Sequence, residues 1–137
     1  MQDYPEKDAK AAIQLQQIFY RMTKYFIENF NTANFLTEAL YHSKAASYFT
    51  NYRVQNFIFV RTLIEQAQRE GDICSDMNSY EIYTTLQSIL IQPIIIKNNI
   101  LQQHKNEPLM NKLKLIDVSS ESSLQKRLRV AFKGLRP

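Results

Sequence analysis

The chain has few of the residues that interrupt regular structure. Its 137 residues include two glycines and four prolines, whereas a protein built from many short strands needs turn residues every ten or so positions. The one cysteine, Cys74, permits no intrachain disulfide and no cysteine-rich zinc site, and we expect it to be an inert thiol. These absences favour an all-α protein of a few long helices.

Long hydrophobic runs are also missing. The most apolar run, from Ile89 to Ile96, is eight residues long and includes Gln92 and Pro93, whereas a membrane span requires about 20 apolar residues. The first residues, "MQDYPEKDAKAA", are polar and of mixed charge, unlike a secretory signal. We therefore expect a cytoplasmic protein that does not enter a membrane.

Motifs that carry catalysis are absent. The two histidines, His42 and His104, are far apart in the sequence, and no metalloprotease, nucleophile-elbow or glycine-rich phosphate motif occurs. His42 is close to a predicted aromatic helix, where it is either a ligand contact or a structural or surface residue. We predict that the protein is not an enzyme and holds no metal and no cofactor.

Positive charge is concentrated toward the C-terminal end. Residues 1–96 contain 8 Lys/Arg against 10 Asp/Glu, and residues 97–137 contain 9 against 3. A basic end suits nucleic acid or an anionic membrane, but no aromatic residues alternate with these cations as they do in nucleic-acid-binding segments. We interpret the basic residues as solvated helix faces, with cations near helix C-termini.

Apolar residues recur with helical spacing along most of the chain. The first predicted helix runs from Glu6 to Phe30, with Pro5 in its first turn and Asp8 near its positive end. The others are a short helix around residues 35–43, a long helix from about 46 to 70, a helix from about 78 to 101, a short turn at 109–115, and a last helix that begins at Ser119 or Ser120 and closes at Gly134.

The stretch "QREGDICSDMNSYEI" predicts the end of one helix and the start of the next. Gly71 follows the last periodic residues, where helices commonly end at positive φ. Asn78 and Glu81 have capping-box spacing, and Met77 and Ile82 are spaced as a hydrophobic staple. Both Gly71 and Asn78 are therefore expected to be structural residues and not ligand contacts.

Two features exceed what a simple bundle requires. The 8 Phe and 8 Tyr concentrate between residues 19 and 83, where they either line an apolar pocket or fill a core. The helix around Pro93 and the last helix carry rich apolar stripes that are either core or a face for a second copy of the chain. Pro93 itself predicts a kink, because the apolar periodicity continues beyond it.

The middle and the end of the chain resemble the ligand-binding domain of the tetracycline-repressor (TetR) family of bacterial transcriptional regulators. Those proteins often show Ile-x-x-(Gly/Ala)-x-x-x-Gly-x-(Ile/Leu/Phe), then Asp-x-(Asp/Asn). The matching residues here are Ile64, Ala67, Gly71, Ile73, Asp76 and Asn78. The ending "LRVAFKGLRP" is similar to the family's closing helix at Phe132, Lys133, Gly134 and Leu135. The family's N-terminal helix-turn-helix has no counterpart in these residues.

The resemblance implies one all-α domain over residues 1–137, a bundle of five to six helices in which residues 5–78 mainly form an effector pocket. The effector would be a small apolar or aromatic molecule, and DNA binding would belong to an absent N-terminal domain. The ligand-binding candidates are Phe19, Met22, Phe26, Phe30, Leu36, Leu40, Tyr52, Asn56, Phe59 and Tyr83.

The resemblance also implies that residues 79–137 mainly serve dimerisation, with the last two long helices forming a four-helix bundle with a second copy. The dimer-interface candidates are Leu86, Leu90, Ile94, Leu124, Leu128, Ala131 and Leu135. We thus expect the regulatory domain of a transcriptional repressor. The alternative is a helical adaptor that binds a partner protein through the same faces and has no small-molecule ligand.

Overall fold

The computed structural model describes residues 8–28, 57–104 and 107–137 of the chain. All regular structure in these ranges is helical, which confirms the all-α class, and none of the helices found there is long and apolar enough to cross a membrane. The elements are α1 (Ala11–Glu28), helical residues 57–69, α4 (Ser79–Leu90), α5 (Gln92–Gln103), α6 (Leu109–Leu115) and α7 (Glu121–Gly134).

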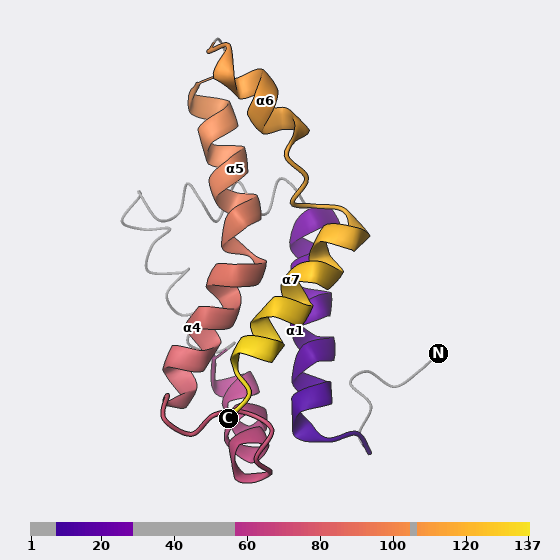
Figure 1. Cartoon of the computed structure of the whole chain (residues 1–137), viewed down its shortest axis with the longest axis vertical. Coiled ribbons are helices and arrows are strands. Elements are labelled where there is room, and N and C mark those ends of the chain that lie inside the picture. The colour runs from indigo at the N-terminus through magenta and orange to yellow at the C-terminus, as the bar shows by residue number, and fades with distance from the viewer. Residues whose placement is uncertain (1–7, 29–56, 105–106) are drawn as a thin grey trace.

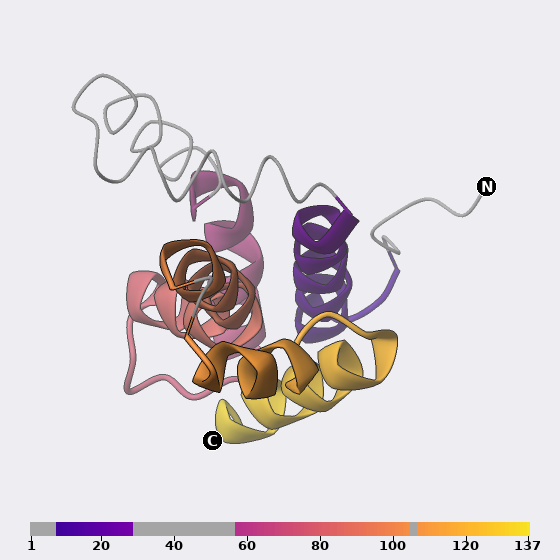
Figure 2. The same ribbon diagram turned by 90° about the horizontal axis from the view of Figure 1, so that it is seen from above.

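The helices converge on one core. Helix α7 packs against both α1 and α4. Helix α5 continues beyond α4, and α6 packs beside its far end (Figure 1). The view from above shows α7 crossing beside α1 (Figure 2). The side chains with no exposed surface that centre this core are Leu15, Phe19, Val60, Ile64, Ala67, Ile82, Leu86 and Leu90.

Helix α1 buries the face that its periodicity predicts but begins at Ala11. Asp8 lies in a turn, so its predicted place inside the helix is wrong. The amide of Ala11 donates to Glu70 Oε1 over 3.4 Å, and Gln14 Nε2 donates to the carbonyl of Ala9 over 2.8 Å. The helix start is therefore set partly by Glu70, a residue far away in the sequence, which local pattern cannot reveal.

Gly71 ends the helix of residues 57–69 as predicted. Its φ is +81°, the single positive value found in the described ranges. The amide of Gly71 donates to the carbonyl of Gln68 over 3.1 Å, and the amide of Asp72 donates to the carbonyl of Ala67 over 3.0 Å. This pair of bonds is the Schellman arrangement, which satisfies the last carbonyls of the helix and requires a residue that tolerates positive φ.

Asn78 caps α4, also as predicted. Its side-chain oxygen accepts a hydrogen bond from the amide of Glu81 over 2.9 Å, and its side-chain nitrogen donates to Glu81 Oε1 over 3.2 Å. The carboxylate of Glu81 also lies in the first turn of α4, where the helix dipole favours negative charge. The cap fixes where α4 begins after the Gly71 turn.

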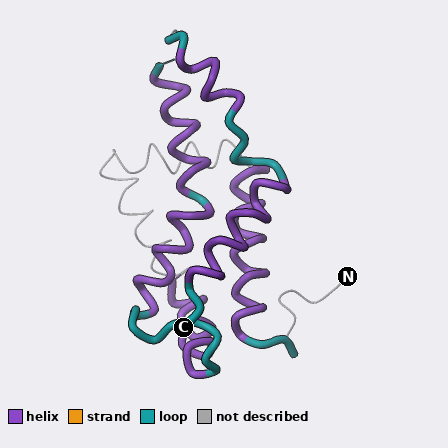
Figure 3. The backbone as a smooth tube through the Cα atoms, in the orientation of Figure 1, coloured by secondary structure: helices purple, strands orange, loops and turns teal. Residues whose placement is uncertain are grey.

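Pro93 interrupts the rod formed by α4 and α5 at Ile91, which Figure 3 marks as a short break. Pro93 is in the first turn of α5, where its missing N–H removes no helical bond. The amide of Ile94 donates to the carbonyl of Ile91 over 3.1 Å instead of bonding to Leu90. The predicted continuation of helical structure beyond Pro93 is confirmed, with α4 and α5 separated at Ile91.

The last two helices follow the predicted boundaries closely. Helix α6 spans Leu109–Leu115, and Ser120 caps α7 by accepting from the amide of Ser123 over 3.1 Å. Gly134 is the last residue of α7 but does not adopt positive φ, so it does not end the helix in the way Gly71 does. The end of α7 is held instead by Leu135, whose carbonyl accepts from the amide of Cys74 over 2.8 Å.

Candidate functional site

Four aromatic rings from three helices form a continuous cluster. Phe57 lies 5.5 Å from Tyr83 and 5.6 Å from Tyr80 between ring centroids, and Phe19 lies 6.0 Å from Tyr83. All three pairs meet edge to face, the arrangement that the aromatic quadrupole favours. We call Phe19, Phe57, Tyr80 and Tyr83 the aromatic cluster; it joins α1, the helix of residues 57–69 and α4.

The aromatic cluster runs from the core to the surface. Phe19 and Tyr83 are buried, Phe57 is half-buried and Tyr80 is 60% exposed. The hydroxyl of Tyr83 accepts a hydrogen bond from Gln87 Nε2 over 3.0 Å, so its polar end is satisfied inside the protein. An apolar or aromatic molecule that stacks on the exposed ring of Tyr80 would thus be linked to the buried ring of Tyr83 through Phe57.

The structure brings some of the predicted ligand residues together and separates another. Phe19, Phe26 and Tyr83 are buried and Met22 is partly buried against the same core. Phe59, in contrast, is 66% exposed, because the helix of residues 57–69 faces the core through the positions occupied by Val60, Ile64 and Ala67. Phe30, Leu36, Leu40, Tyr52 and Asn56 lie outside the described residues.

The ligand-binding candidates include neither Phe57 nor Tyr80, although Phe57 belongs to the aromatic residues between 19 and 83 that are predicted to line a pocket or fill a core. The signal for Phe57 was present, since it precedes the buried Val60 by three residues and therefore shares its face of the helix. Tyr80 is in the first turn of α4, outside the buried stripe, and no periodicity singles it out. Its place in the cluster depends on how α4 lies against Phe57.

The predicted dimer-interface residues lie inside the single chain. Each of them has at most 9% of its surface exposed, and nearly all belong to one connected core: Leu86, Leu90, Ile94, Leu124, Leu128, Ala131 and Leu135. Side chains that their own chain covers contribute little area to another contact. Dimerisation stays a prediction, and an interface would take most of its area from outward residues such as Ile96 and Val130, which are 51% and 61% exposed.

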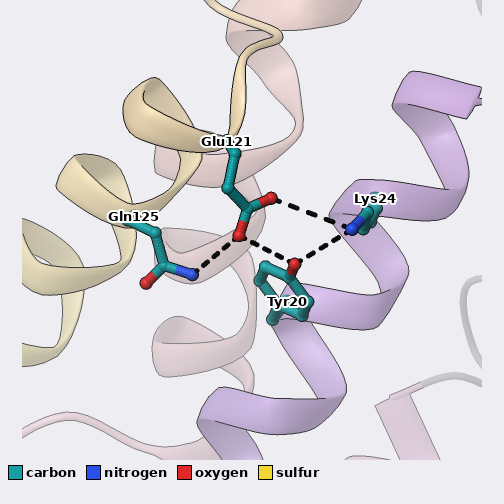
Figure 4. Close-up of polar contacts among 4 residues, drawn as sticks. All are labelled: Tyr20, Lys24, Glu121 and Gln125. Atoms are coloured by element: carbon teal, nitrogen blue, oxygen red, sulfur yellow. Dashed lines mark hydrogen bonds and ion pairs between the residues drawn. The ribbon is translucent and has the colours of Figure 1, made fainter.

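A second group of polar side chains connects α1 with the start of α7 (Figure 4). Tyr20 Oη donates to Glu121 Oε1 over 2.8 Å, and Lys24 Nζ donates to Tyr20 Oη over 3.2 Å. Gln125 Nε2 donates to the same Glu121 oxygen over 3.1 Å, and Lys24 Nζ lies 3.9 Å from Glu121 Oε2. We call these four residues the polar clasp.

The electrostatics of the polar clasp favour a structural role. The hydrogen bond to Tyr20 raises the pKa of Lys24, and the hydrogen bonds from Gln125 and Tyr20 lower the pKa of Glu121. Both shifts stabilise the charged forms, so neither group is prepared to exchange a proton near neutral pH. The polar clasp joins residues 101 positions apart and aligns α1 with α7.

The described ranges also contain one cysteine, Cys74, and one histidine, His104, which are residue types that often carry chemistry. Burial raises the pKa of the Cys74 thiol, and the contribution of Asp76 acts in the same direction, which disfavours the reactive thiolate. Among the residues that the structure describes, no three His, Cys, Asp or Glu side chains are grouped to hold a metal ion. His104 is exposed at the end of α5, and His42 lies outside the described residues.

Comparisons with known proteins do not assign this chain to a family. No protein-family model matches it, no curated protein matches it, and no solved structure matches it. The aromatic cluster is a group in which side chains from three helices meet and also reach the surface.

Proposed function

We propose that this chain is the regulatory domain of a TetR-type transcriptional regulator, a repressor that binds a small apolar or aromatic effector and forms a homodimer. The observation that carries the proposal is the aromatic cluster, because its rings come from α1, the helix of residues 57–69 and α4. A ligand on the exposed end of the cluster contacts elements on both sides of the Gly71 turn. DNA binding would belong to another domain.

The local structure around the motif residues supports the proposal. Gly71 supplies the positive φ that ends one helix, and Asn78 supplies the cap that begins the next. Ala67 and Ile64, which precede that turn in the helix of residues 57–69, are fully buried, so the tightly packed core limits the size and shape of the side chains at these two positions. These are the structural roles that a recurring Ile/Ala/Gly/Asn pattern would serve.

A regulatory mechanism follows from the connections of α4. The aromatic cluster holds the first turns of α4 against the helix of residues 57–69, and α4 continues through the Pro93 break into α5. A ligand that binds one arrangement of these helices more tightly than another shifts their populations, by as much as its difference in affinity. Such a shift would reach a second copy through the outward faces of α5 and α7.

The experiment that tests this function is a thermal-shift screen with small apolar and aromatic compounds. A compound at a hundredfold excess over its Kd should stabilise the protein by roughly 2.7 kcal/mol. Tyr80→Ser should weaken that stabilisation, since Tyr80 is the exposed end of the aromatic cluster. Tyr25→Ser is the matched control, because Tyr25 is a comparably exposed tyrosine outside the cluster.

Sedimentation of the same protein tests the dimer. We expect a dimer at micromolar concentration, and a monomer there would contradict the proposed homodimeric regulator. Equal loss of ligand response in the Tyr80 and Tyr25 variants would remove the aromatic cluster as the binding site. A screen in which no compound stabilises the protein would favour the second candidate.

The second candidate function is a helical adaptor for a partner protein. Helix α6 favours it, because Leu109, Leu115 and Ile116 are 64%, 85% and 55% exposed at the far end of α5. Apolar side chains grouped on a short exposed helix are typical of protein contacts. Leu115→Ser would abolish partner binding in an adaptor but leave the ligand response of a sensor unchanged.

A further inference from the structure

A groove runs along the seam between α1 and α7, on a side of the molecule that the aromatic cluster does not use. It has a volume of about 920 Å³, and the Gly71–Asp72 turn contributes to its wall. The polar clasp pairs Tyr20 with Glu121 at the start of α7, and the groove brings Ile13, near the start of α1, beside the residues at the end of α7, so the two helices run antiparallel. The first turns of α1 therefore lie beside the second half of α7 (Figures 1 and 2).

The edges of the groove are basic. Lys10 lies on the α1 side, and Arg129, Lys133 and Arg136 follow one another on the α7 side at i, i+4 and i+7, which is one face of a helix. All four side chains are exposed, and within the described ranges none of them is in an ion pair. This stripe of positive charge is therefore available to a partner.

The floor of the groove is apolar. Leu128 and Phe132 line it from α7 between the cations but are buried, with 9% and 8% of their surface exposed, so Ile13 of α1, which is 45% exposed, supplies most of the apolar surface that a partner can reach. From Gln125 to Arg136 the α7 wall is roughly 16 Å long at the rise of an α-helix. A groove of this length, with basic edges and an accessible apolar side chain at Ile13, matches the face of a short amphipathic helix.

One acidic residue marks an end of the groove. Asp72 follows Gly71, and its Oδ2 atom is buried without a hydrogen-bond donor among the residues described. A partner with a lysine or arginine at the corresponding end would complement the negative charge of Asp72, which would fix the partner's direction in the groove.

We propose that this basic groove binds an acidic amphipathic helix of a partner protein. The partner would place aspartate or glutamate opposite Arg129, Lys133 and Arg136, and leucine-like side chains against the floor. A second copy of this chain does not suit the groove, because its formal net charge is +4 and a two-fold contact would bring the same cations together. A single-stranded nucleic acid would stack its bases on exposed aromatic rings, whereas Phe132, the ring that lines the groove, is buried.

The test is a binding titration of the purified chain with a labelled helical peptide of about 15 residues. The peptide carries glutamate at i, i+4 and i+7, leucine on the adjoining face, and a lysine at one end. Its matched peptide has glutamine at each glutamate. We expect binding that weakens as salt rises above about 0.15 M, and at least about tenfold weaker binding of the glutamine peptide.

Two variants locate the binding site. Arg129→Glu with Lys133→Glu should weaken binding at least about tenfold, while Lys112→Glu with Lys126→Glu changes the net charge equally outside the groove and should leave binding within about threefold. Ile13→Gln alters the floor without a change of charge and should also weaken binding. Circular dichroism checks that each variant retains its helices.

Several results would overturn the proposal. Absence of binding below about 1 mM would do so, as would equal binding of the two peptides or an equal effect of the groove and control variants. A short DNA duplex or a phosphatidylserine vesicle is titrated in parallel. If either binds and the acidic peptide does not, the basic stripe serves a different class of partner and the proposal is wrong.

Discussion

The guanidinium of Arg127 on α7 donates a hydrogen bond from Nη2 to the backbone carbonyl of Leu90, the last residue of α4, over 3.1 Å. That carbonyl lacks its usual helical donor because Pro93 interrupts the rod and Ile94 bonds to Ile91 instead. Arg127 also donates to Ser123 Oγ over 2.7 Å, which holds the side chain in place. One side chain thus joins α7 to the break between α4 and α5.

Replacing Arg127 by methionine tests the importance of this contact. The Arg127→Met variant keeps an unbranched side chain but leaves the Leu90 carbonyl without its donor, and we expect the free energy of unfolding to fall by about 1 to 2 kcal/mol. Urea denaturation measures the change. Arg129→Met on the exposed side of the same helix is the control and should change stability by no more than about 0.5 kcal/mol. Equal effects of the two variants would show that Arg127 has no special role.

The two glycines provide a matched pair for backbone conformation. Gly71 has φ +81° and Gly134 is helical, and apart from the adjacent residues and the local helix backbone, no atom lies within 4 Å of a Cβ added at either position. Gly71→Ala should therefore destabilise the protein by about 1 to 2 kcal/mol through left-handed strain alone. Gly134→Ala should be neutral or stabilise it by up to about 1 kcal/mol. Thermal unfolding of both variants checks this difference, and the same sign for both would contradict it.

The cap of α4 is tested at Asn78. Asn78→Ala removes the oxygen that accepts from the amide of Glu81 and should lower the free energy of unfolding by about 1 kcal/mol. Asn78→Asp retains an acceptor at the positive end of the helix and should keep most of the stability. Urea titrations of the two variants distinguish the effect of losing the capping oxygen from other effects of replacing Asn78. An aspartate variant as unstable as the alanine variant would exclude the capping role.

The polar clasp predicts how stability depends on pH. Hydrogen bonds from Gln125 and Tyr20 lower the pKa of Glu121, so its contribution is present above its unfolded pKa and is lost as pH falls through the folded value. The hydrogen bond to Tyr20 raises the pKa of Lys24, so that contribution is present below the unfolded pKa of lysine and is lost as pH rises through the folded value.

The measurement compares the wild type with Glu121→Gln in urea across the acid range. The wild type should be the more stable protein at neutral pH, and the difference should disappear as the pH falls below the usual range of a glutamate. Hydrogen bonds from Ser120 and Ser119 also lower the pKa of Asp117. Because Asp117 is present in both proteins, its contribution to the pH dependence cancels in the difference between them. A difference that persists in acid would mean that Glu121 acts through packing instead of charge.

The sequence by itself determined the helix boundaries that depend on local backbone bonds. Gly71, Asn78 and Ser120 mark their helix ends because positive φ and side-chain caps act within a few residues. Helix α6 and the interruption at Pro93 were predictable for the same reason. The start of α1 was not, since Glu70 takes part in it from the end of another helix.

Only the tertiary structure decided which side chains meet. Periodicity identifies a stripe but not the partner that covers it, so Phe59 is exposed while Leu86 and Leu124 are fully enclosed by their own chain. A long cation can lie in solvent or bury its stem, and Arg127 is partly buried with its guanidinium on the Leu90 carbonyl. The aromatic cluster and the basic groove likewise depend on tertiary packing. The cluster requires α1 to lie against α4, and the groove requires α1 to lie against α7, and contacts between residues distant in the sequence determine both arrangements.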